Sequence, residues 1–486
     1  MTRLFVATLV IVICAVACAH DDPRFVGFFA AYKNCRARYA EIDARIDAAG
    51  VRDAGYYRVP GFPYLRTDRT LASFRNEVHS IDEVGAWVRH MREYDQEARE
   101  FEYVNLGLSI QEAAILRFDL LNCGRGLAGI ELDDPANRAR LIAAVVPPDD
   151  YSDTARTLGL YPLAVPLLRA RVTQHQTAVM RAFARPLGEL GQHGPLLLWQ
   201  VKPVEDRSLV ANGYGDSLAD ELGFPGLFDS AWRALAEVNA PALWIDTDDE
   251  RDRPGAPTWS ASGATVDASQ PLVYYQITFT RFGTERLTQI NYFVWFKGHG
   301  DPSAGSVDDH IDGMIWRVTL DQQARPLAYE SLRASGSDHL WFATGAVTPR
   351  IENSYWHEPA LFPQPQVPDG LKVLRLQSAT HALQRVVGAD QVAATESHVY
   401  ELRRYEDLLM LPRPDGSSRS LFGPDGLVAG SRGADGILLR ASGIRQPGAP
   451  RQLGHHAISY IGRSEFDDPF VLESVFVPPP AAPATD

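Results

Sequence analysis

Apolar residues recur at helical spacing in the first half of the chain. One long stripe advances in steps of three and four residues: Phe25, Phe28, Tyr32, Cys35, Tyr39, Ile42 and Ile46. Residues at this spacing lie on one face of an α-helix, so the stripe predicts an amphipathic helix that ends near Gly50.

Helix starts are marked by capping residues. Ser80 and Ser109 are each followed three residues later by a glutamate, which is the capping-box pattern and predicts helices from about Ile81 and Ile110. Asp134 precedes a proline and marks a third start. Two proline-bearing apolar segments, 59–74 and 158–172, are expected to be loops packed against a core.

After about residue 240 the pattern changes to short alternating segments separated by turns. These segments predict strands, at Leu272–Thr280, Arg286–Phe296, Met314–Leu320, Leu327–Arg333, Leu371–Ala379, Val399–Tyr405, Ile437–Ala441 and Ala457–Ile461.

The two patterns together predict an α+β fold. We expect a helical domain at 18–240, an acidic, proline-containing hinge at 241–270, and a β-rich domain at 271–476. The β-rich domain should hold a mostly antiparallel sheet, sandwich or barrel-like, and the proline-rich tail 477–486 is disordered by composition.

The predicted strand 286–296 carries two amides on one face. Gln289 and Asn291 alternate with core residues and share their face with Phe293 and Trp295. A buried amide needs partners, so these side chains either bridge the sheet to the helical half or line a polar pocket. Bridging is the expectation, because buried polar groups are mostly satisfied by structural contacts.

The N-terminus has the features of an export signal. Arg3 precedes an apolar run from Leu4 to Ala19 that is too short to span a membrane. The run ends in Ala15-Val16-Ala17-Cys18, which resembles the lipobox of bacterial lipoproteins and implies that residues 1–17 are removed and Cys18 is acylated. Ala19 in place of aspartate implies outer-membrane sorting. The alternative is ordinary Ala-x-Ala cleavage, which would release a free periplasmic protein.

Two cysteines then remain, and both lie at helical core positions. Cys35 belongs to the stripe above, and Cys123 follows Leu116 and Leu120 at the same spacing. In an oxidising compartment these residues predict one disulfide between two packed helices, with two buried thiols as the alternative.

Charge and motifs narrow the function. The net charge of −14 argues against binding to nucleic acid and against attraction to anionic lipid headgroups. Attachment to a membrane should therefore come from the N-terminal lipid. The sequence holds no phosphate-binding loop, nucleophile elbow, His-Glu-x-x-His or Cys-x-x-Cys. A structural or binding protein of the cell envelope, with an envelope protein or the cell wall as partner and no cofactor, is the first hypothesis.

Two alternatives use residues of the second half. A metal-dependent hydrolase would bring a divalent ion to His339, His357, Glu358 and His456, and the acidic run 246–252 is a weaker candidate for calcium. A cell-wall carbohydrate binder would use Trp295, Trp316 and Trp341 as stacking platforms beside Gln289 and Asn291.

Several long segments resemble one family. They are "GFPYLRTDRTLASF", "RFGTERLTQINYFVWF", "DGMIWRVTLDQQARPLAYES", "SLFGPDGLVAGS" and "RQLGHHAISYIGRSEFDDP". These segments are similar to those of a family of uncharacterised proteobacterial exported proteins, many of them predicted lipoproteins. The resemblance implies an envelope location and no particular activity.

Overall fold

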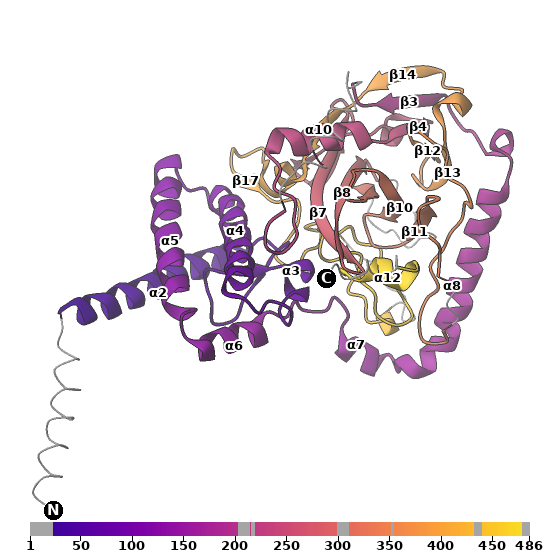
Figure 1. The fold of residues 1–486 in the computed structure, drawn as a ribbon. Helices are drawn as coiled ribbons and strands as arrows, with labels where there is room; N and C mark the ends of the chain where they lie inside the picture. Colours follow the sequence, from indigo (N-terminus) through magenta and orange to yellow (C-terminus); the bar gives the residue numbers. More distant parts are fainter. Residues whose placement is uncertain are drawn as a thin grey trace, which may run out of the picture.

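The computed structural model describes residues 23–202, 214, 219–298, 311–350, 354–431 and 440–478. Their fold is α+β, as predicted, with helices in the N-terminal half and mostly antiparallel sheets in the C-terminal half (Figure 1). Within these ranges, no helix combines the length and the apolar character that crossing a bilayer requires.

The N-terminal helices begin where their capping residues predict. Both Ser80 and Ser109 form complete capping boxes, and Asp134 accepts a hydrogen bond from the backbone of Ala136. We call these three helices, together with the long N-terminal helix and one short helix, the helical unit. They pack around a core that includes Ile46, Trp87 and Met91. The helices of the unit are α2 (Pro23–Ala49), α3 (Arg69–Ser73), α4 (Ile81–Asn105), α5 (Ile110–Glu131) and α6 (Pro135–Ala144).

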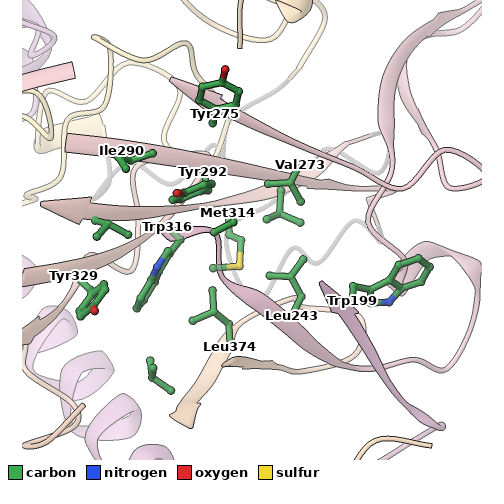
Figure 2. Packing of buried hydrophobic residues seen from close by; sticks show 14 of the residues in the cluster. Trp199, Leu243, Val273, Tyr275, Ile290, Tyr292, Met314, Trp316, Tyr329 and Leu374 are labelled. Atoms are coloured by element: carbon green, nitrogen blue, oxygen red, sulfur yellow. The ribbon is translucent and has the colours of Figure 1, made fainter. Parts of the chain in front are cut away.

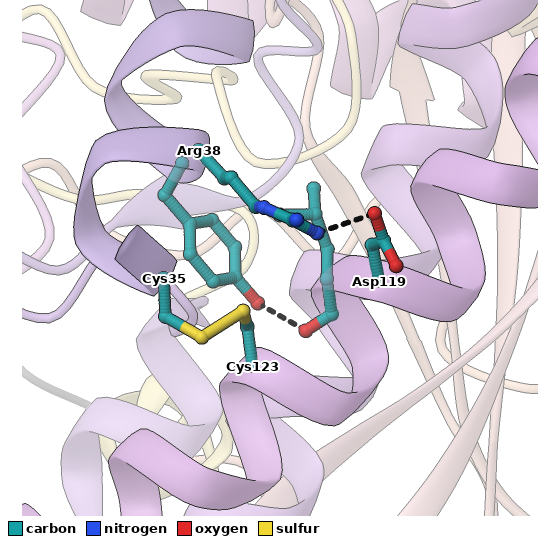
Figure 3. The surroundings of a disulfide bond; sticks show 6 residues. Cys35, Arg38, Asp119 and Cys123 are labelled. Atoms are coloured by element: carbon teal, nitrogen blue, oxygen red, sulfur yellow. Dashed lines mark hydrogen bonds and ion pairs between the residues drawn. A yellow bond between two sulfur atoms is a disulfide. The ribbon is translucent and has the colours of Figure 1, made fainter. Parts of the chain in front are cut away.

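A disulfide joins α2 to α5, as predicted (Figure 3). Cys35 and Cys123 are separated by 88 residues in the sequence. On the same helix pair, the Tyr39 hydroxyl donates to the Leu120 carbonyl over 2.8 Å and Arg38 forms an ion pair with Asp119. The bond therefore fixes two helices that already share a core.

Two sheets make up most of the second half. The six-stranded sheet has the order β11-β10-β9-β8-β7-β15, and the five-stranded sheet has the order β13-β12-β4-β3-β14. The strands of the first are β7 (Leu272–Phe282), β8 (Glu285–Phe296), β9 (Asp312–Leu320), β10 (Pro326–Arg333), β11 (Leu340–Ala343) and β15 (Glu401–Arg404). Those of the second are β3 (Leu196–Gln200), β4 (Ala242–Asp246), β12 (Val373–Leu376), β13 (Leu383–Val387) and β14 (Glu396–Val399).

The two sheets share one apolar core (Figure 2). Ile290 and Trp316 of the six-stranded sheet pack in the same cluster as Leu243 and Leu374 of the five-stranded sheet, and all four are buried. Because side chains alternate along β8 and β9, every second one enters this core. The side chains between them lie on the opposite face of the six-stranded sheet and contact other parts of the chain.

The predicted boundaries need correction in three places. β3 lies within the range expected to be helical but is a strand of the five-stranded sheet, and β4 replaces part of the expected hinge. The segment expected to be a loop around Pro166 is part of helix α8 (Tyr161–Ala184), which runs beside the sheets, away from α2, α4 and α5 (Figure 1). The helix tolerates both of its prolines. Pro162 lies in the first turn, where a backbone N–H would have no partner within the helix, and Pro166 removes one hydrogen bond of the helix.

The last two predicted strands are not found. Residues 437–439 lie outside the described ranges, and Arg440 begins a helical turn. In 457–461 the pairing is limited to a bridge between Ala457 and Glu465, because backbone N–H groups there donate to the side chains of Glu358 and Tyr151 instead of a neighbouring strand.

The remaining elements are short. They are β1 (Tyr57–Arg58), β2 (Arg66–Thr67), α7 (Asp153–Leu158), α10 (Asp229–Asn239), β5 (Ala256–Ser260), β6 (Gly263–Asp267), β16 (Leu411–Pro412), β17 (Ser418–Arg419), α12 (Val471–Val475) and the 3-10 helices η1 (Leu187–Glu189), η2 (Glu250–Asp252), η4 (Ala389–Gln391) and η5 (Tyr405–Met410).

Candidate functional site

A pocket of about 490 Å³ lies between the helical unit and the six-stranded sheet. Its lining comes from α3 and α4, the first turn of α10, the edge of β7, the start of η5 and the segment 452–454. β15 pairs only with residues 272–275 of β7, so the edge of β7 from Gln276 to Phe279 is free to form one side of the pocket.

The floor is a polar band on the sheet face opposite the shared core. Strand register places Asn291 between Gln276 and Arg317, and Gln289 between Thr278 and Thr319. Neighbouring strands in register bring these side chains within reach of one another.

Asn291 uses its hydrogen bonds inside the sheet. Its amide donates to the Thr278 hydroxyl over 2.9 Å and to the Gln276 carbonyl over 3.3 Å, and its carbonyl accepts from Arg317 Nε over 2.7 Å. Gln289 likewise donates to Thr319 over 3.2 Å. The expected bridge to the helices is therefore not made, and Asn291 instead orients the arginine beside it.

Gln289 and Arg317 both line the pocket and keep hydrogen-bonding capacity unused. Gln289 is 3% exposed and Arg317 is 1% exposed. Within the described ranges, Gln289 Oε1 accepts no hydrogen bond, and Arg317, which also donates to the Phe466 carbonyl through Nη1, has no partner for Nη2. Trp295, the third residue expected at this site, is buried beside Phe422 and is not part of the lining.

One wall combines two carboxyls with two tyrosines. The rings of Tyr56 and Tyr94 stack with centroids 4.1 Å apart. Tyr94 donates to Asp68 over 3.2 Å and Tyr56 to Glu97 over 3.4 Å. Local structure positions these groups: Asp68 is the N-cap of α3, and Tyr94 and Glu97 lie one turn apart on α4.

Both carboxyls of this wall hold protons more tightly than an exposed carboxyl does. Burial raises the pKa of Asp68 to about 6, and burial together with Glu406 and Asp53 raises the pKa of Glu97 to about 7. Within the described part of the chain, neither residue forms an ion pair, and the same is true of Asp53.

Three of the four arginines that line the pocket, Arg69, Arg233 and Arg404, are engaged by other acids, and the fourth, Arg317, lies 3.6 Å from Glu330. Arg69 lies 3.2 Å from Asp467 and 3.3 Å from Asp150. Arg404 lies 3.2 Å from Glu406 and 3.3 Å from Asp229. The pocket therefore keeps an excess of carboxyl groups that no neighbouring guanidinium neutralises.

The residues predicted to bind a metal are not brought together. Among the described residues, no group of three or more His, Cys, Asp or Glu side chains has an arrangement that could hold an ion. His339 lies 2.9 Å from Glu330, His357 bonds to Ser354, and His456 contacts the Ala334 carbonyl. Glu358 accepts from Ser459 and from the backbone of Tyr460. His357 bonds within its own loop, whereas His456 and Glu358 each hold together segments that are more than 100 residues apart in the sequence.

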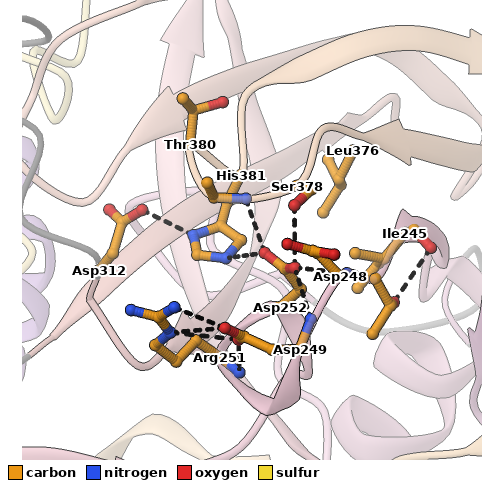
Figure 4. A network of polar contacts seen from close by, with 12 residues as sticks. Ile245, Asp248, Asp249, Arg251, Asp252, Asp312, Leu376, Ser378, Thr380 and His381 are labelled. Atoms are coloured by element: carbon orange, nitrogen blue, oxygen red, sulfur yellow. Dashed lines mark hydrogen bonds and ion pairs between the residues drawn. The ribbon is translucent and has the colours of Figure 1, made fainter. Parts of the chain in front are cut away.

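The acidic run 246–252 is also used internally (Figure 4). Asp252 accepts from the Ser378 hydroxyl and the Ala379 backbone and lies 3.3 Å from His381 Nε2. His381 Nδ1 lies 2.9 Å from Asp312. Because these contacts occupy the carboxylate of Asp252, the run holds a turn in place instead of offering a calcium site.

The three tryptophans proposed to stack on sugars are core residues. Trp295, Trp316 and Trp341 are each at most 2% exposed. A stacking platform has to present a ring face to its ligand, so these residues cannot serve a carbohydrate site.

A second hollow of about 520 Å³ lies over β3 and β14. Its acidic groups have local partners: Asp249 pairs with Arg251, and Glu396 lies 3.4 Å from His398. Two buried polar atoms of its lining, Trp199 Nε1 and His398 Nε2, have no hydrogen-bond partner, but the rings of these two residues stack on each other with centroids 4.5 Å apart.

No pattern in the sequence identifies most of the pocket residues. Tyr56, Asp68, Tyr94 and Glu97 come from three separate segments that carry no shared motif. Arg317 did leave a signal, since it is a lone charged residue within the apolar strand "MIWRVTL".

Comparisons of this chain with protein-family models, with curated proteins and with solved structures find no match. The family resemblance and the lipidation of Cys18, which lies outside the described ranges, therefore stay predictions.

Proposed function

We propose that this protein is a lipid-anchored binding protein of the bacterial cell envelope, and that it binds a small molecule in the pocket between the helical unit and the six-stranded sheet. The observation that carries this proposal is the unused hydrogen-bonding capacity of Gln289 and Arg317, two buried residues of the pocket floor. The atoms of these two residues that lack partners are open to the cavity, and the lining also holds one fully buried acceptor without a partner, Gln276 Oε1. Unsatisfied polar groups in a cavity favour a ligand.

The size and lining of the pocket agree with this function. A volume of about 490 Å³ lies in the range of roughly 300–1,000 Å³ that is typical of small-molecule sites. Aromatic side chains from α4, α10 and β7 supply apolar surface, and the many charged and polar side chains of the lining can fix the orientation of a polar ligand.

The pocket can be tested with a variant at its rim. Ser230 is exposed in the first turn of α10 and lines the pocket, so Ser230→Trp should cover the entrance without disturbing a core. Mature protein is screened against metabolite and cell-wall fragment libraries by thermal shift, and hits are quantified by calorimetry. We expect hits to lose about tenfold or more in affinity in Ser230→Trp, because they must displace the indole.

Ser230→Ala is the matched control and should bind every hit as the wild type does. Equal affinity in the tryptophan variant, or a library that produces no hit, would contradict the proposed site.

The envelope location is supported by the signal-like N-terminus and the lipobox-like Ala15-Val16-Ala17-Cys18. We expect Cys18→Ala to move the protein from the membrane fraction to the soluble fraction, because the lipid is the expected anchor. The measurement is fractionation of disrupted cells, with metabolic labelling by a fatty-acid analogue. A wild-type protein that is already soluble and unlabelled would refute lipidation, and the protein would then be a free periplasmic one.

A further inference from the structure

We propose that the ligand of this pocket is an organic amine, with an ammonium group held at the wall formed by Asp68, Tyr94, Tyr56 and Glu97 and an apolar body beside the aromatic side chains. This inference rests on the proposed function and names its ligand class.

The first argument is charge balance. Asp53, Asp68 and Glu97 line one cavity, and within the described ranges none of them has a cationic partner at ion-pair distance. A buried carboxylate without a counter-charge is costly. A ligand cation supplies that charge, whereas an anion would be repelled and a neutral sugar would leave the carboxyls unpaired.

The second argument is the aromatic composition of the same wall. The rings of Tyr56 and Tyr94 stack on each other, and their hydroxyl groups donate hydrogen bonds to the two carboxyls of the wall. Trp232 of α10 is half-buried, lines the pocket and contacts Phe279 edge-on, with ring centroids 6.0 Å apart. Aromatic faces and carboxylates together are the groups that recognise ammonium ions.

The third argument is independent of the acidic groups. On the floor, Gln289 Oε1 and Arg317 Nη2 have no partner within the described residues, and both side chains are at least nine-tenths buried. Gln276 Oε1 is a further buried acceptor of the lining without a partner. These groups suit a polar substituent at a second point of the ligand, so the site is built for more than a single ion.

The net charge of the whole protein also favours a cationic ligand. The chain carries a net charge of −14, which raises the local concentration of cations and speeds their association.

The surroundings of each carboxyl determine how binding depends on pH. Glu97 faces Glu406, Asp53, Arg404 and Tyr56, and its pKa is about 7. Asp68 faces Asp467 and Tyr94 besides its capping bond to the Leu71 backbone, and its pKa is about 6. An ammonium ion binds the ionised carboxylates, so affinity should rise as the pH rises through these values.

The test compares benzylamine with benzyl alcohol, a neutral molecule of nearly the same shape. Binding to mature protein is measured by saturation-transfer NMR and calorimetry at about pH 5 and about pH 8. We expect benzylamine to bind about tenfold or more tightly than benzyl alcohol at the higher pH, and to lose most of that advantage at the lower pH.

The variants are Glu97→Gln and Asp68→Asn, which keep shape, and asparagine also keeps the helix cap. Each should weaken benzylamine binding by about tenfold. Glu41→Gln, at an exposed carboxyl of α2, is the matched control and should change nothing. Circular dichroism verifies that every variant is folded.

Equal affinity for the two probes, or unchanged benzylamine binding in both carboxyl variants, would overturn the amine assignment. If instead a neutral or anionic compound binds and Ser230→Trp abolishes its binding, the amine assignment fails while the proposed function stands. If no compound binds at all, the proposed function itself fails.

Discussion

Arg66→Met is expected to lower the free energy of unfolding of the helical unit by about 3–5 kcal/mol. Arg66 is fully buried and lies 3.2 Å from Asp95 and 2.7 Å from Glu102, whose side chains are at most 3% exposed. Removal of the guanidinium leaves Glu102 in the core without its cation, whereas Asp95 keeps a second one, Arg99, at 2.8 Å. Glu102 also accepts from the Asp53 backbone, so the loss extends to the loop that forms one end of the pocket.

The measurement is urea unfolding followed by circular dichroism. Arg38→Met is the matched control, because Arg38 pairs with Asp119 at the surface, with side chains 52% and 36% exposed, and such a pair contributes about 0–1 kcal/mol. Adding Glu102→Gln to Arg66→Met should restore part of the loss, because it removes the carboxylate that is left without a cation. A loss of less than about 1 kcal/mol in Arg66→Met would mean that the buried ion pairs do not stabilise this core.

Reduction of the disulfide is expected to lower the free energy of unfolding by about 2–5 kcal/mol. Cys35 and Cys123 are 88 residues apart, so the bond closes a long loop and removes much conformational freedom from the unfolded chain. Urea unfolding of the wild type with and without dithiothreitol measures the difference.

The double variant Cys35→Ser/Cys123→Ser should unfold at a similar urea concentration to the reduced wild type and should not respond to reductant. Overlapping curves for oxidised and reduced wild type would show that the bond contributes nothing to stability. Arg66 follows Leu65, which belongs to the same core as Cys35 and Cys123, so the two losses are not expected to be independent.

Local chemistry explains which elements were predictable. The helices from Ile81 and Ile110 begin where predicted because a serine and a glutamate satisfy their first N–H groups within a single turn. The alternation in β8 likewise separated Ile290, Tyr292 and Val294, which enter the shared core, from the polar face. The disulfide followed from two cysteines on apolar stripes.

The errors arise where distant segments compete with local preference. β3 is a strand because β4 and β14 pair with it from residues far along the chain. The histidines of the second half were grouped by their number, yet His339 contacts Glu330 of β10 and His456 contacts the carbonyl of the distant Ala334. Proximity in sequence carries no information about such partners.

The sequence by itself determined the α+β order of the chain, the helix starts, the disulfide and the polar face of β8, because each depends on spacing within a segment or on composition. Only the tertiary structure decided that Gln289 and Arg317 form the floor of a cavity and that Asp68, Tyr94, Tyr56 and Glu97 meet above it. These residues come from separate segments, and the packing of the helical unit against the edge of β7 is what brings their side chains together.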